Sequence, residues 1–210
     1  MSSPLELNIV TDFMKNLLYS TSFYSPLILL SSIFVFSVFT STVYKFGWYI
    51  LWVFTISCIR YFSYSKNLIG DNTTNTLCNT FIPLDYTYST FILTFTMTYF
   101  VMPMILVSTQ NHINAINYFV IGLFMSYIVF DIIVKKNIGC IPKLLSVGLI
   151  STILLSILAG VITVLIMYGS TLKNYLYINE VNTNKEVCSM PSKQQFKCRV
   201  FKDGTLIGNI

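Results

Sequence analysis

Long stretches without charge constrain this chain more than any motif does. The sequence has 45 residues without a formal charge between Asp85 and Asp131, and 29 between Lys15 and Lys45. A charge at the centre of a bilayer is costly, whereas about 20 consecutive apolar residues are enough to cross it as a helix. Apolar residues make up 54% of the chain and charged residues 10%, too few charges to cover a soluble domain of 210 residues. We therefore predict an all-α membrane protein that is held in a lipid bilayer.

The charges and the turn residues between apolar runs predict about five transmembrane helices. They belong to a membrane domain that covers 24–172 and follows an N-terminal segment, 1–23. We expect the helices at 24–43, 47–64, 88–107, 118–134 and 144–170, with the tight turn between the first two at Gly47. The second is the weakest, because only 14 residues separate Lys45 from Arg60, and it crosses only if the Arg60 guanidinium extends to the membrane interface. Four spans are the alternative.

The fifth run is rich in small residues, which let membrane helices approach closely. They are Gly148, Ser151, Ser156, Ala159 and Gly160. We expect this helix to pack tightly against a neighbour.

Lysine and arginine near the ends of the spans predict the orientation. Six lie on the side of the N-terminus: Lys15, Arg60, Lys66, Lys135, Lys136 and Lys143. Lys45 and Lys173 lie on the other side. We therefore expect a cytoplasmic N-terminus, and an odd number of spans then places the C-terminal tail across the membrane. The glycosylation pattern at Asn72 would remain cytoplasmic and unmodified.

Four of the five cysteines fall into two pairs on the same predicted side of the membrane. Cys78 and Cys140 lie in two loops of one side, and Cys188 and Cys198 share the tail. Each pair is a candidate disulfide, and the oxidation state of the tail pair is left open because its geometry is not visible in the sequence. Cys58 lies inside the second helix, where we expect a structural thiol.

The tail, 173–210, is polar and basic, with six Lys or Arg against three acidic residues. Alternation in "QFKCRVF", the turn "KDGT" and the run "LIG" predict a short β-hairpin. Such a hairpin is marginally stable alone, so we expect it to be clamped by a disulfide or paired with another protein. The candidate partner contacts are Lys193, Lys197, Arg199 and Lys202. They favour an acidic or phosphate-bearing surface, although they could equally serve only to keep an exposed tail soluble.

The order "CSMPSKQQFKCRVFKDGTLIG", placed after several uncharged spans, resembles the tails of small membrane proteins of nucleocytoplasmic large DNA viruses such as chlorella-type viruses and iridoviruses. The resemblance covers about twenty residues at the C-terminus. It implies a minor capsid component that ties an internal lipid membrane to an icosahedral capsid through its polar loops and tail. These viruses tend to encode a thiol oxidase, so the resemblance also allows disulfides on the cytoplasmic side.

Asp131, in "SYIVFDIIVKK", is the charge that lies deepest in a predicted helix. Such a residue marks a functional site by default. However, it lies four residues before Lys135, and an i,i+4 ion pair at the interface would satisfy it. We favour this structural interpretation over an ion or proton path. Elsewhere, the single His112 has no nearby acid or nucleophile motif, so we predict no enzyme, no metal site and no cofactor.

These patterns favour a structural multi-pass membrane protein, located in a viral internal membrane, whose polar segments bind other membrane or capsid proteins. Association with further copies of itself is left open. No nucleic-acid-binding motif accompanies the net charge of +5, so we expect no nucleic-acid partner. The alternatives are a small pore or transporter subunit that uses Asp131, and an accessory subunit of an organellar membrane complex.

Overall fold

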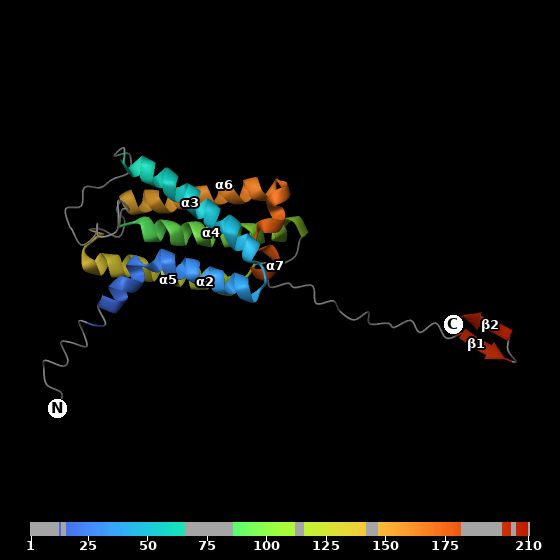
Figure 1. The fold of residues 1–210 in the computed structure, drawn as a ribbon. Helices are drawn as coiled ribbons and strands as arrows, with labels where there is room; N and C mark the ends of the chain where they lie inside the picture. The colour runs from blue at the N-terminus through green and yellow to red at the C-terminus, as the bar shows by residue number, and fades with distance from the viewer. Residues whose placement is uncertain are drawn as a thin grey trace, which may run out of the picture.

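The computed structural model describes residues 13, 16–65, 86–111, 116–141, 147–181, 199–202 and 205–209, and this part is mostly helical. The long helices are α2 (Ser25–Phe39), α3 (Val43–Ser65), α4 (Tyr88–Asn111), α5 (Tyr118–Ile138) and α6 (Val147–Tyr168). The 3₁₀-helix η2 (Thr171–Tyr175) and the short helix α7 (Ile178–Val181) follow. The strands β1 (Arg199–Lys202) and β2 (Thr205–Asn209) pair antiparallel. The long helices lie side by side as a bundle (Figure 1).

A helix occupies each of the five predicted ranges, but fewer than five helices are apolar enough to be assigned as spans. Helices α4, α5 and α6 are long and apolar enough to cross a membrane. A fourth span results if the helix Asn16–Phe23 and α2 count as one broken span. Helix α3 does not qualify because its tyrosines, serines and two cations lower its hydropathy. The structure therefore supports three or four spans by composition.

The first predicted helix, 24–43, begins at the right place but ends too late, and a helix before it was not expected. A helix at Asn16–Phe23 precedes α2, and the two meet at an angle of 67°. Pro26 lies in the first turn of α2, where it lacks the N–H that would continue the hydrogen bonding of the preceding helix. At the other end, α2 stops at Phe39, and the turn into α3 contains Ser41 with a φ of 56°. Gly47, predicted to form this turn, lies within α3.

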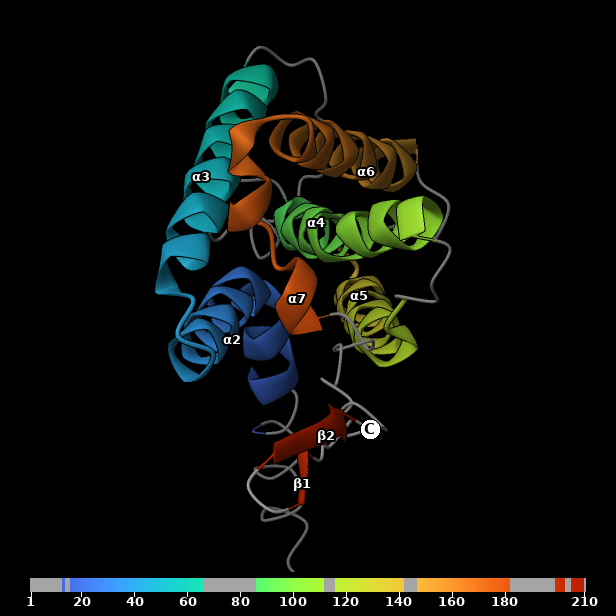
Figure 2. The ribbon, with the colours of Figure 1, turned by 90° about the vertical axis from the view of Figure 1, so that its right-hand side faces the viewer.

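Helix α4 is the centre of the bundle. Viewed from the end, it lies between α6 and α5, with α2 and α3 to one side (Figure 2). In the most apolar 18-residue stretch of each helix, the buried share is 61% in α4, 22% in α5 and 33% in α6. Its aromatic side chains fill the core together with Tyr49 of α3, whose ring centroid lies 5.4 Å from that of Tyr99. Because α4 is the most enclosed helix, the polar side chains it carries must be satisfied inside the protein.

Among the described glycines, Gly160 of α6 is the one that lies tightly against α4. A Cβ atom built at this position would lie 2.7 Å from Cβ of Thr98 and 3.4 Å from the backbone oxygen of Phe95. The expectation that small residues of this run permit tight packing therefore holds at Gly160. By contrast, a Cβ built at Gly122 of α5 meets nothing within 4 Å.

We predict opposite effects for the same substitution at these two glycines. Gly160→Ala should lower the thermal midpoint in detergent, because overpacking of a well-packed contact costs about 1–3 kcal/mol. Gly122→Ala should leave it unchanged or raise it, since alanine favours the helix and has room there. Equal midpoints for the two variants would contradict the α4–α6 contact.

Candidate functional site

A buried carboxylate of one helix lies among hydroxyl groups from two others. Asp131 of α5 is fully buried, and its Oδ1 accepts a hydrogen bond of 2.6 Å from the hydroxyl of Ser22. The hydroxyl of Ser89 lies 3.1 Å from both carboxylate oxygens, and that of Thr90 donates to Oδ2 at 2.7 Å. Ser89 and Thr90 belong to the first turn of α4, whose positive dipole end also favours a negative charge.

Lys135 completes this site, one turn further along α5. Its Nζ lies 2.7 Å from Oδ2 of Asp131, and both side chains have a relative exposure of 0%. The ammonium also donates to the hydroxyls of Ser89 and Thr90. The predicted i,i+4 pair is therefore present, and its predicted place at the membrane interface stays a prediction. The pair lies inside the protein because α4 and the helix Asn16–Phe23 enclose it.

This arrangement is a compensated ion pair that connects three helices. Each carboxylate oxygen has at least two hydrogen-bond donors, and the ammonium has three acceptors. Removing charges from water is costly, and only good geometry with additional hydrogen bonds offsets that cost. The sequence indicated Asp131 and Lys135 but not the three hydroxyl residues. Serine and threonine are frequent in α4, and most of its threonines bond to backbone carbonyls of their own helix, as Thr94, Thr96, Thr98 and Thr109 do.

A second buried charge lies at the interface of α3 and α4. Arg60 has a relative exposure of 6%, donates to the Thr87 hydroxyl at 2.6 Å, and places its guanidinium carbon 4.5 Å from the ring centroid of Phe91. The Thr87 hydroxyl in turn lies 3.2 Å from that of Thr152 in α6. This side chain turns inward onto α4, and its extension to the membrane interface stays a prediction.

The opposite end of the bundle has its own ion pair. Nζ of Lys45 lies 2.7 Å from Oε1 of Glu180 and donates at 2.9 Å to the carbonyl of Leu176. Burial, with a smaller effect from Glu180, raises the pKa of Tyr177 to about 12, so this phenol is neutral at ordinary pH. Its hydroxyl lies 2.5 Å from that of Ser37. These contacts fix the segment from η2 to α7 against α2 and α3.

Most of the other predicted site residues cannot be placed. Cys78, Cys188, Cys198, Lys193, Lys197 and His112 lie outside the described residues. Arg199 and Lys202 are the ends of β1. Cys140 is fully buried and is not free, whereas Cys58 is a free thiol. The disulfides Cys78–Cys140 and Cys188–Cys198 and the tail contacts therefore stay predictions.

Within the described residues, no group of three or more His, Cys, Asp or Glu could hold a metal ion. Comparison of the chain with family models, with curated proteins and with solved structures finds no match.

We predict that the Asp131–Lys135 pair is strongly coupled in stability. Asp131→Asn or Lys135→Met alone should destabilise the protein by about 3–5 kcal/mol, because each leaves the other group buried without its partner. The double variant should recover a large part of that loss. The measurement is a double-mutant cycle of unfolding free energies in detergent.

Lys136→Met is the matched control, because Lys136 is the neighbouring lysine and is exposed. It should change the free energy by less than about 0.5 kcal/mol. Additive effects of the two single substitutions would contradict the pairing.

Proposed function

We propose that this chain is a structural multi-pass membrane protein that is anchored by its helices and binds other proteins through its polar segments. The observation that carries the proposal is the internal use of its buried charges. Asp131 pairs with Lys135, Lys45 pairs with Glu180, and Arg60 contacts Thr87 and Phe91. These groups hold helices to one another, so they serve the bundle itself. The large side chains that the described helices expose are apolar, and the tail is polar in sequence.

We further propose that α3 crosses the membrane, which gives five spans. Both of its cations turn inward, since Lys45 and Arg60 have relative exposures of 4% and 6%. Its exposed face is apolar or aromatic: Val43, Tyr44, Ile50, Leu51, Phe54, Ile59, Tyr61 and Phe62. The mean hydropathy of α3 includes both cations, although their buried side chains would not contact lipid. The face that lipid would contact is therefore as apolar as that of the other helices.

The contacts of α3 agree with this topology. Tyr49 bonds to Thr96, Ser57 to Tyr88 and Arg60 to Thr87, so residue numbers rise along α3 as they fall along α4. Helix α3 has 23 residues and α4 has 24, so an antiparallel α3 beside a spanning α4 is long enough to reach both membrane surfaces.

Cysteine labelling in sealed vesicles tests the span. We predict that a membrane-impermeant maleimide labels Ser41→Cys and Lys66→Cys from opposite sides, in a chain whose native cysteines are replaced by serine. The parent without added cysteine gives the background, and its thermal midpoint shows that it remains folded. Labelling of both positions from the same side would leave four spans.

The resemblance of the tail to viral membrane proteins supports a more specific role. In this role the chain lies in a virion internal membrane, with its tail or polar loops in contact with capsid or neighbouring membrane proteins. The basic residues of the tail suit an acidic partner surface. A disulfide between Cys78 and Cys140 or between Cys188 and Cys198 would stiffen the contacting segments.

Reversing the charge of the tail should abolish attachment to the partner protein. We predict that a photo-reactive benzophenone residue placed at Gln195, whose chemistry does not need lysine, cross-links the tail to a stoichiometric partner protein in isolated membrane-containing particles. Changing Lys193, Lys197, Arg199 and Lys202 to Glu should lower the yield about tenfold or more, because like charges across an interface repel.

Lys136→Glu serves as the control for a single charge change elsewhere, and membrane insertion should be normal in both variants. A chain that is not cross-linked to any stoichiometric partner would contradict the proposal.

A second candidate function is an ion or proton path through Asp131. The observation in its favour is the helix break at Tyr24, two residues after Ser22, which bonds directly to the buried carboxylate. Transporters place ion sites at such broken helices. Reconstituted liposomes should then show a flux that Asp131→Asn abolishes and Lys136→Met preserves. A wild-type chain without flux would eliminate this candidate.

A further inference from the structure

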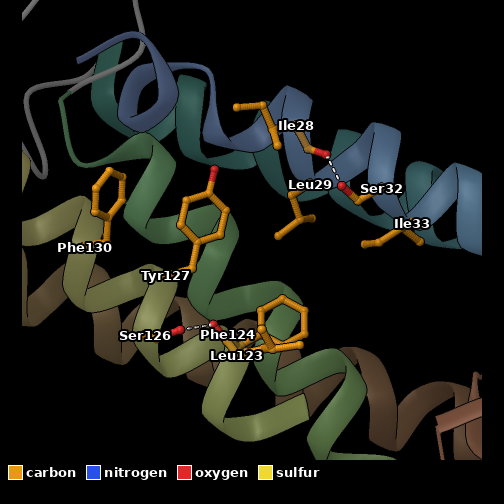
Figure 3. A pocket seen from close by; sticks show the side chains of 9 residues that line it. All are labelled: Ile28, Leu29, Ser32, Ile33, Leu123, Phe124, Ser126, Tyr127 and Phe130. Carbon is orange, nitrogen blue, oxygen red and sulfur yellow. Dashed lines mark hydrogen bonds between the residues drawn. The ribbon is translucent and has the colours of Figure 1, made fainter. Parts of the chain in front are cut away.

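An apolar groove separates α2 from α5 on the outside of the bundle. Its volume is about 510 Å³, and its walls are two rows of side chains that face each other (Figure 3). Helix α2 supplies Ile28, Leu29, Ser32 and Ile33, and α5 supplies Leu123, Phe124, Ser126, Tyr127 and Phe130. Leu29 and Ile33 are buried members of the core, so the core itself forms the floor of the groove.

The serines of the groove offer little to a polar ligand. The hydroxyl of Ser32 donates to the carbonyl of Ile28 at 2.7 Å, and that of Ser126 donates to the carbonyl of Leu123 at 2.8 Å. Both bonds run within their own helices (Figure 3). With these donors already used, the walls present mainly methyl, methylene and ring surface. A hydrocarbon is the chemistry that fits them.

The lining of the groove is short. From Leu123 to Phe130 it extends about 10 Å along α5, at a rise of about 1.5 Å per residue. A helix of a second copy or of a partner would be held over only about two turns, whereas a flexible acyl chain can fill a space of about 510 Å³ of this length.

The groove is continuous with the surface that faces lipid. Its flanks on both helices are exposed apolar side chains: Leu27, Val35, Met125 and Val129. In a bilayer, an acyl chain can pass from this surface into the groove without leaving an apolar environment. An empty groove would leave its walls without dispersion contacts on one side, which is unfavourable.

We propose that the groove between α2 and α5 holds an acyl chain of a membrane phospholipid. The proposal requires only that α2 and α5 lie in lipid, and it is independent of the partner that the tail binds. The lipid fills the gap where α2, bent away at Tyr24, does not pack against α5. Its chain thereby completes the packing on this side of the bundle.

Photo-cross-linking in vesicles tests the proposal with the full-length chain. The probe is a phosphatidylcholine that carries a diazirine in one acyl chain, diluted into vesicles of palmitoyl-oleoyl phosphatidylcholine. We expect peptides containing 28–33 and 123–130 to be cross-linked about threefold more than the exposed face of α6, because the groove surrounds the chain with partner atoms. Ser32→Phe should reduce this enrichment to the level of α6.

Ser31→Phe is the matched control. Ser31 is exposed beside Ser32 and donates to the same carbonyl of Ile28, but it does not line the groove. It should keep the enrichment. If Ser32→Phe lowers the thermal midpoint more than the control does, Ser126→Leu replaces it as the filling variant.

Uniform labelling of all exposed helix faces would overturn the proposal, and so would enrichment that survives a folded filling variant. Protein cross-links between groove residues and a second copy or a partner would assign the groove to that protein instead.

Discussion

The need to satisfy polar groups inside a protein that lipid surrounds governs this structure. Helix α4 meets that need, because hydroxyl groups at its start form hydrogen bonds with charged side chains of neighbouring helices. Ser89 and Thr90 bind the Asp131–Lys135 pair, and Thr87, just before the helix, binds Arg60. No water is available at membrane depth to perform this role. The positions of α3, α5 and the helix Asn16–Phe23 around α4 are therefore determined by hydrogen bonds as well as by apolar packing.

The same constraint explains how the chain can contain charges and still present an apolar exterior. Apolar packing adds little specificity between helices in lipid, since lipid chains are as apolar as the side chains. Specific pairs such as Tyr49 with Thr96 and Lys45 with Glu180 supply it at different levels of the bundle. Gly160 adds a steric element by allowing α6 to approach Thr98. A few residues thus define how the helices align with one another, while most of the surface needs only to be apolar.

What could be predicted from the sequence follows from this division. The helices were found because charges interrupt apolar runs, and the Asp131–Lys135 pair was found because its spacing is local. The break at Tyr24 was missed, since Pro26 also fits the first turn of an unbroken helix. The inward turn of Arg60 was missed because its partners lie 27 and 31 residues away in the chain. Ser22 was missed for the same reason, since Asp131 lies 109 positions further along the chain.

The helix break at Tyr24 connects the two most unusual features of the bundle. It directs Ser22 toward Asp131, which gives the buried carboxylate one of its donors. The same bend sets α2 at an angle of 67° to the preceding helix, and the groove lies along α2 beyond it. The bend thus lets one segment bond to the ion pair while the next segment lines the groove. The space that we propose for an acyl chain is therefore linked through this bend to the residues that satisfy the buried charge.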